Sequence, residues 1–146
     1  MLDSYNLQGD WAKVNEWARK FYNEDKLATG KFREDLAKLI EQSAFKLVNQ
    51  LEAKKDFGKA ADAYIAFVTE FPKSEIADKA LFNASIDYFN ARQLDKAIET
   101  RKRIIQGYPK SSFVPQTLFA LAEGYDAVAD FENAAAGYEA YAAQYE

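Results

Sequence analysis

The sequence contains no cysteine and no histidine. Without cysteine it forms no disulfide, no thiolate metal site and no cysteine nucleophile, and without histidine it lacks the commonest general base and metal ligand. It has only 3 prolines and 6 glycines, and it has no apolar run of about 20 residues, the length needed to span a bilayer. These absences exclude most familiar enzyme sites, and we expect no metal ion, no cofactor and no membrane insertion.

The charge of the chain is low and of mixed sign. Its 146 residues include 19 Lys and Arg and 23 Asp and Glu, which leaves a net charge of -4. Binding to nucleic acid or to an anionic membrane surface needs a basic patch, so we expect neither partner. With 49% hydrophobic and 29% charged residues, the composition is that of one globular domain, and its expected partners are proteins or peptides.

One segment of the sequence recurs at a spacing of 37 residues. Residues 56–64 (DFGKAADAY) align with residues 130–138 (DFENAAAGY) at twice this spacing, and residues 93–101 form the copy between them. Other positions agree in the same register, among them Ala60, Ala97 and Ala134. So many agreements predict three copies of one structural unit.

Each copy has the pattern of two helices joined by a turn. In the second copy one amphipathic stripe covers residues 81–88 and another covers residues 94–104. Pro72 and Pro109 are expected to end the second helices, and Ser74 and Ser111 are placed to cap the helices that follow.

The aromatic, small and proline columns resemble the tetratricopeptide repeat, in which helical hairpins stack into a right-handed superhelix. The resemblance implies an all-α solenoid of antiparallel hairpins, with repeats at residues 41–77, 78–114 and 115–146. Two departures are the absence of Trp from the first-helix columns and the bulky Val48 at a position that is usually small.

The period of 37 is longer than that of the family's usual repeat. The extra residues, 75–77 and 112–114, are expected to lengthen each first helix by about one turn. This longer form is similar to the repeats of bacterial cell-envelope proteins, namely outer-membrane assembly lipoproteins, Tol–Pal coordinators and gliding-motility components. The similarity implies a location in the periplasm or cell envelope.

The two ends of the sequence predict a fragment of a longer repeat protein. Residues 1–40 are expected to hold a partial hairpin: a second-type helix from Asp10, a loop and the start of a long helix. Residues 1–146 are therefore interpreted as a single solenoid fragment, because neither end carries a polar capping helix. Tyr138, Tyr141 and Tyr145 would then lie on an uncovered last helix and favour end-to-end self-association.

The predicted binding site consists of the columns that packing within each repeat does not use. In folds of this resemblance the fifth, ninth and twelfth positions of the first helices project toward the concave side. They are Phe45, Asn49, Glu52, Phe82, Ile86, Phe89, Phe119, Glu123 and Asp126. An apolar strip with flanking carboxylates is typical of a groove for an amphipathic helix or an extended peptide with positive flanks. The alternative is that the Phe columns belong to the core between repeats.

We expect a non-enzymatic protein–protein interaction scaffold within a larger envelope complex. Glu52, Glu123 and Asp126 could share a face, but carboxylates on a helical surface form such groups by chance more often than they form catalytic pairs. Two alternatives are an accessory helical domain of a cell-wall enzyme and a purely structural oligomerisation module. The basic cluster at residues 101–103 is interpreted as a solvated surface on a second helix.

Overall fold

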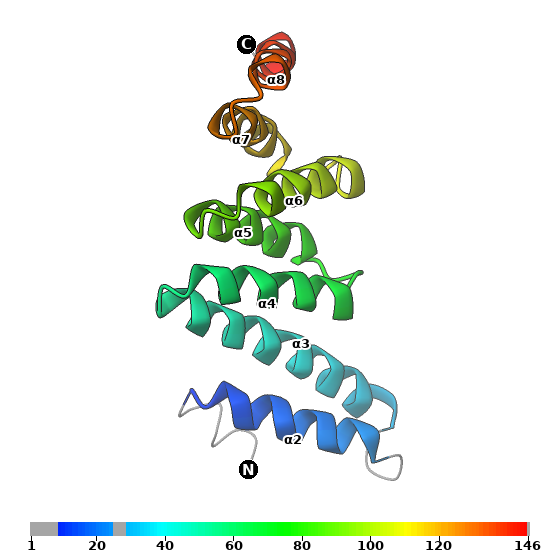
Figure 1. The fold of residues 1–146 in the computed structure, drawn as a ribbon. Coiled ribbons are helices and arrows are strands. Elements are labelled where there is room, and N and C mark those ends of the chain that lie inside the picture. Colours follow the sequence, from blue (N-terminus) through cyan, green and yellow to red (C-terminus); the bar gives the residue numbers. More distant parts are fainter. Residues whose placement is uncertain (1–8, 25–28, 146) are drawn as a thin grey trace. The chain divides into compact units, whose positions relative to one another are not determined.

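The computed structural model describes residues 9–24 and 29–145. This part of the chain forms helices and no strand (Figure 1). The helices are α2 (Trp11–Asn23), α3 (Gly30–Ala53), α4 (Phe57–Glu70), α5 (Ala77–Asn90), α6 (Leu94–Gly107), α7 (Val114–Ala127) and α8 (Phe131–Tyr145). None of the helices in the described part is long and apolar enough to cross a membrane. The expected all-α fold class is confirmed.

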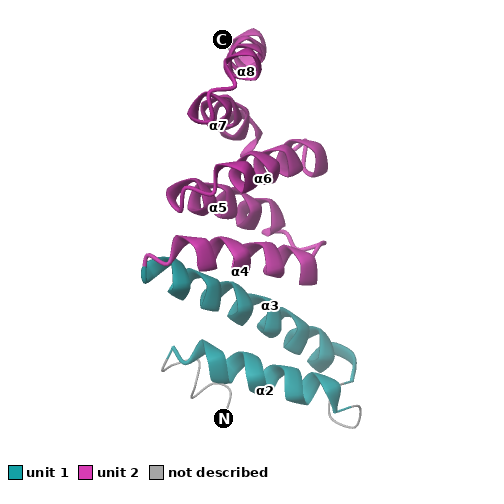
Figure 2. Ribbon diagram, viewed as in Figure 1, with its two compact units in different colours: residues 1–54 teal, residues 55–146 magenta. Residues whose placement is uncertain are grey.

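The chain divides into two compact units, residues 1–54 and residues 55–146 (Figure 2). In the N-terminal unit α2 packs on α3. In the C-terminal unit α4 packs on α5, α5 on α6, α6 on α7 and α7 on α8. The division falls within the first expected repeat, residues 41–77, between its two helices.

The N-terminal unit is held together by a polar link as well as by apolar packing. The α2 helix begins at the expected place, because the side chain of Asp10 accepts a hydrogen bond from the backbone N–H of Lys13 at 3.2 Å. Further along α2, Asn15 Nδ2 donates to the carbonyl oxygen of Ile40 and to Ser43 Oγ on α3, both at 2.9 Å. Ser43 is fully buried, so this link satisfies a polar group that would otherwise be costly to bury.

The spacing of 37 residues recurs in the backbone. Lys55, Arg92 and Ala129 have positive φ values of 60°, 60° and 61°, in the left-handed region that favours glycine. Next to Arg92 and Ala129, the following amide donates back to the carbonyl of Tyr88 or Tyr125 at 2.9 Å, which closes the same helix-ending motif twice. The repeat read from the sequence therefore corresponds to a repeated backbone conformation.

The turns after α4 and α6 are also copies of each other. As expected, the helices end just before Pro72 and Pro109. The two serines act differently from the prediction: the hydroxyls of Ser74 and Ser111 accept the amides of Ile76 and Phe113, at 3.1 Å each. These amides belong to the N-cap residues of α5 and α7, which have no side-chain cap. The serines thus stabilise the turns before the helices, and the predicted helix caps are wrong.

The extra residues of the repeat lie mainly in these turns. Helix α5 begins at Ala77 and α7 begins at Val114, so only the last of each set of three is helical. The expected lengthening of the first helices is therefore wrong. The physical reason is that the serine hydroxyls bind the amides of the residues before the helices and hold these residues in a turn. Pro115 lies in the first turn of α7, where its missing N–H costs little.

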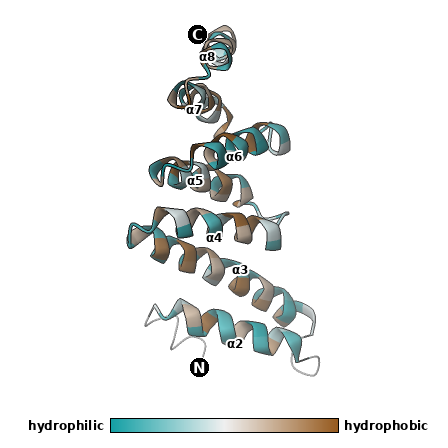
Figure 3. Ribbon diagram, in the orientation of Figure 1, coloured by the Kyte–Doolittle hydropathy of each residue, from teal (hydrophilic) through white to brown (hydrophobic). Residues whose placement is uncertain are grey.

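Hydrophobic and hydrophilic residues are interleaved along the helices, as amphipathic helices require (Figure 3). In the C-terminal unit, Tyr88 of α5 packs between Ala61 of α4 and Ala97 of α6, and both alanines are fully buried. Small residues let neighbouring backbones approach, and the aromatic ring fills the remaining volume. Ala97, a member of the repeated alanine column, thus lies against the ring of Tyr88.

Two residues of α5 test which face of this helix is the core. Leu81 is fully buried and Ile86 is 41% exposed. We expect Leu81→Ala to lower the free energy of unfolding by about 2–5 kcal/mol, because it leaves a cavity. Ile86→Ala, the matched control, should change it by less than about 1 kcal/mol. Denaturant titration followed by circular dichroism measures both; equal losses would contradict the assigned orientation of α5.

Candidate functional site

The predicted site residues of the C-terminal unit lie on α5 and α7 and differ in exposure. Ile86 and Phe119 are 41% and 42% exposed. Glu123 and Asp126 are exposed, whereas Phe82 and Phe89 are half-buried. Phe89 packs against the core cluster that contains Tyr88, as the alternative interpretation of the Phe columns expects. We call this set the outer strip; it consists of Phe82, Ile86, Phe89, Phe119, Glu123 and Asp126.

The other three predicted residues lie on α3, in the N-terminal unit. Phe45, Asn49 and Glu52 are all half-buried there. They belong to the other unit, and the candidate site of the C-terminal unit consists of residues on α5, α6 and α7.

Neighbouring aromatic rings hold the phenylalanines of the outer strip. Phe82 stacks on Phe113, with 4.7 Å between ring centroids. Phe119 makes edge contacts with Tyr138 and Tyr141 of α8, at 5.4 and 5.5 Å. Tyr145 in turn packs on Tyr141 at 5.4 Å and is 40% exposed. The phenylalanines are thus partly packed and partly accessible, and two of the three terminal tyrosines contact α7.

Arg101 of α6 lies beneath the outer strip, and its prediction as a solvated residue is wrong. Predicted as part of a solvated basic surface, it is only 4% exposed. Its Nη1 donates to the carbonyl oxygen of Ala120 on α7, and its guanidinium lies 5.0 Å from the ring centroid of Phe89 on α5. The sequence contained a signal for this burial, because Arg101 falls on the apolar stripe of α6, 37 residues from Tyr64 and Tyr138.

Gly124 of α7 makes room for this arginine. A Cβ at Gly124 would lie 2.8 Å from Arg101 Nη1 and 3.0 Å from Ile98 Cγ1. The long apolar stem of an arginine can fill the space of an aromatic side chain, provided that its head finds polar partners. Arg101 and Gly124 therefore form one local adaptation of the junction between α6 and α7.

The charge of Arg101 interacts with residues on both α5 and α7. Burial lowers the pKa of its guanidinium, and the negative charge of Glu123 acts in the opposite direction. An arginine remains protonated under these influences. Its Nε is buried and has no hydrogen-bond partner among the described residues. Arg101 thus places one positive charge between Phe89 of α5 and Glu123 of α7.

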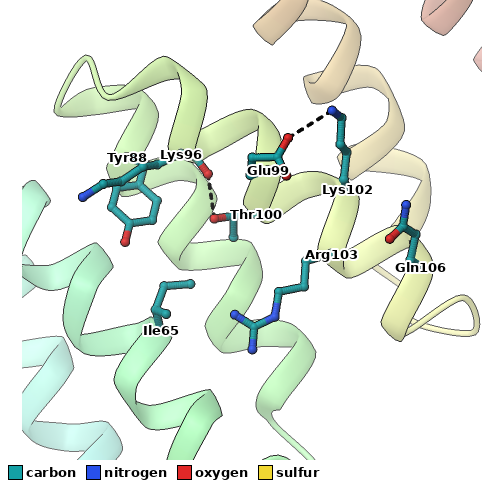
Figure 4. Close-up of a pocket in the computed structure, with 8 residues that line it drawn as sticks. All are labelled: Ile65, Tyr88, Lys96, Glu99, Thr100, Lys102, Arg103 and Gln106. Carbon is teal, nitrogen blue, oxygen red and sulfur yellow. Dashed lines mark hydrogen bonds and ion pairs between the residues drawn. The ribbon is translucent and has the colours of Figure 1, made fainter.

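A hollow of about 430 Å³ lies among α4, α5 and α6 (Figure 4). It is lined by Ile65, Tyr88, Lys96, Glu99, Thr100, Lys102, Arg103 and Gln106. Lys102 pairs with Glu99 at 3.0 Å, and Lys96 pairs with Asp62 at 3.4 Å. The hydroxyl of Tyr88 donates to Asp62 at 2.7 Å; burial and this hydrogen bond raise its pKa, so it is a donor and not a base. The lining thus holds three basic residues and one acidic residue, and the carboxylate that pairs with Lys96 lies outside it.

Most carboxylates of the described residues are spread over the surface of the helices. Among the residues that the structure describes, no group of three His, Cys, Asp or Glu could hold a metal ion. Two of the carboxylates considered in the sequence, Glu123 and Asp126, are exposed on α7, and Glu52 lies in the other unit. The outer strip thus presents accessible apolar side chains next to exposed carboxylates.

Comparison with protein-family models finds no match to this chain, and the searches of curated proteins and of solved structures find none either. The family resemblance stays a prediction.

Gly124→Ala tests the pairing of Gly124 with Arg101. The substitution gains about 1 kcal/mol of helix propensity, but the new Cβ crowds Arg101 and Ile98, which costs about 1–3 kcal/mol. We expect a net loss of stability in the wild-type background and a loss smaller by at least about 1 kcal/mol in an Arg101→Met background. Chemical denaturation of the four proteins measures this coupling.

Gly107→Ala is the control, because nothing lies within 4 Å of a Cβ at this position on α6. It should not be destabilising in either background. Equal effects of Gly124→Ala with and without Arg101 would show that the two residues are not coupled.

Proposed function

We propose that this chain is a non-enzymatic helical-repeat module of the tetratricopeptide type. Its outer strip binds a partner peptide or helix that has apolar anchors and basic flanks. The repeat assignment is supported by turns that are copied at a spacing of 37 residues, with matching φ values and hydrogen bonds.

The main support for the binding proposal is that apolar side chains are accessible on helices that are themselves held rigidly by packing. Ile86 and Phe119 remain more than two-fifths exposed although they stand on well-packed helices. Phe119 is fixed by two tyrosine rings, so little side-chain entropy is lost when a ligand packs on it. Accessible apolar residues on a rigid helical face are the usual anchors for a helix or peptide ligand.

The expected charge of the ligand follows from the carboxylates of α7. Glu123 and Asp126 are exposed beside Phe119. Their negative charges reach α8, where they add to burial in raising the pKa of Tyr138. A ligand with Lys or Arg next to its apolar anchors is favoured by this field, and its affinity should fall as salt is added.

Peptide display on the immobilised protein tests the proposal. From a random library of 16-residue peptides we expect enrichment of sequences with two or three apolar anchors and basic flanks. Ile86→Glu should weaken the best peptide at least about tenfold, because it places a charge in the apolar part of the strip. Fluorescence anisotropy at two salt concentrations measures the affinity.

Lys79→Glu supplies the matched control, since it adds a negative charge at an exposed position of the same helix, outside the strip. It should leave the affinity within about threefold of wild type. Failure to enrich any peptide, or equal binding by the Ile86→Glu protein, would refute the outer strip as the binding site.

A further inference from the structure

The hollow among α4, α5 and α6 has an apolar floor. The floor consists of Ile65 of α4, Tyr88 of α5 and Thr100 of α6, and the last two are each 5% exposed. The hydroxyl of Tyr88 donates to Asp62, and the hydroxyl of Thr100 donates to the carbonyl oxygen of Lys96, at 2.7 Å each. Because both protons are used within the protein, the floor offers a ligand mainly carbon atoms.

Basic side chains of α6 stand at both ends of this floor. Lys96 and Arg103 are seven residues apart, which places them on the same face of the helix. The ammonium of Lys96 lies 5.0 Å from the ring centroid of Tyr88. Figure 4 shows Arg103 reaching from α6 toward Ile65. A ligand on the floor therefore meets a positive charge at either end.

Arg103 is the least compensated of the three basic residues in the lining. Lys96 pairs with Asp62 and Lys102 pairs with Glu99, at 3.4 and 3.0 Å. Arg103 is exposed, and within the described part of the chain its guanidinium has no ion pair and no hydrogen bond. Its N–H donors are therefore available to a ligand.

The repeat does not need an arginine at this position. At a spacing of 37 residues, Arg103 corresponds to Ala66 of α4 and Ala140 of α8, and both alanines are exposed. Lys102 corresponds on α8 to Glu139, which has the opposite charge. Because the other copies of this helix fold without these positive charges, packing within the repeat does not account for them.

We propose that the hollow binds a partner peptide that carries an acidic side chain next to an apolar one. The carboxylate binds the guanidinium of Arg103, and the apolar side chain lies on Ile65 and the ring of Tyr88. This inference goes beyond the proposed function and does not rest on it. The hollow and the outer strip share no residue, and their ligands carry opposite charges.

The balance of charge favours a carboxylate over a phosphate group. Together with Asp62, the lining carries three positive and two negative charges. A carboxylate with one negative charge neutralises the excess, whereas a phosphate group carries close to two charges and is repelled by Glu99. The planar guanidinium of Arg103 also matches a carboxylate, with two parallel hydrogen bonds.

Peptide display with a depletion step tests the proposal. A random library, fused at its C-terminus so that only side chains supply carboxylates, is first depleted on the Arg103→Glu protein. It is then selected on the intact 146-residue chain. We expect the enriched sequences to hold Asp or Glu beside Leu, Ile, Val or Phe. Failure to enrich any such sequence would refute the hollow as a peptide site.

The best peptide, synthesised with blocked ends and a fluorophore, is then titrated by anisotropy. Arg103→Glu should weaken its binding at least about tenfold, because attraction of the carboxylate becomes repulsion. Arg103→Ala should weaken binding as well. It should leave the denaturation midpoint of the protein unchanged, because alanine stands at this position in the other copies.

Lys79→Glu is the matched control for charge. It makes the same change of charge at an exposed position of α5 that lies outside the hollow. It should leave the affinity within about threefold of wild type, because solvent and salt screen the distant charge. Ile86→Glu should bind this peptide normally, which separates the hollow from the outer strip.

The contact between Arg103 and the acidic side chain is tested by changing both partners. Exchange of the acidic residue of the peptide for its amide should weaken binding to the wild-type protein about five- to tenfold. The same exchange should cause no further loss with the Arg103→Ala protein, because the two changes remove the same contact.

Three further results would overturn the proposal. The first is equal binding by the Arg103→Glu protein, and the second is equal binding of the amide peptide by the wild-type protein. The third is displacement of the peptide by inorganic phosphate but not by chloride at the same ionic strength. The hollow would then be a phosphate site.

Discussion

The C-terminal unit depends on one constraint: each helix can bury its apolar face only against the helices next to it along the chain. Contacts run from α4 to α5, α6, α7 and α8 in order. Since a helix surface closes against its neighbour only where small side chains allow approach, residues such as Ala61 and Ala97 are fully buried. Stability is therefore nearly a sum over neighbouring junctions.

This constraint explains how a polar residue entered the core. At the junction of α6 and α7, Arg101 occupies the column that holds tyrosine in the other copies. The exchange is tolerated because Gly124 leaves space and the carbonyl of Ala120 accepts a hydrogen bond. It also brings a positive charge under Phe89 and close to Glu123, which ties the outer strip to the packing beneath it.

The sequence predicted the helix boundaries that depend on interactions between residues close together in the chain. Asp10 begins a helix and Pro72 and Pro109 follow helix ends, because capping and the missing proline N–H act within a few residues. Of the residues assigned to the outer strip, Ile86, Phe119, Glu123 and Asp126 are exposed, whereas Phe82 and Phe89 are half-buried.

Features that depend on distant neighbours were not predicted. The burial of Arg101 requires Gly124, which lies on another helix, and charge alone favoured a solvated position. Ser74 and Ser111 bind amides before the helices because the following residues form a turn, and sequence could not distinguish this from a helix cap. The division at residue 54 has no composition signal, since it falls inside a repeat.

The central claim is that one 37-residue unit is built more than once, and disulfide trapping tests it directly in a chain without cysteine. A Cβ at Gly137 would lie 3.0 Å from the Cβ of Ala122, close to disulfide range. The pair Ala122→Cys and Gly137→Cys should therefore cross-link on mild oxidation. The pair Ser85→Cys and Thr100→Cys, at the positions 37 residues earlier, should cross-link as readily. The pair Ala122→Cys and Ala136→Cys, shifted by one residue, should not; cross-linking of the first pair without the second would contradict the account.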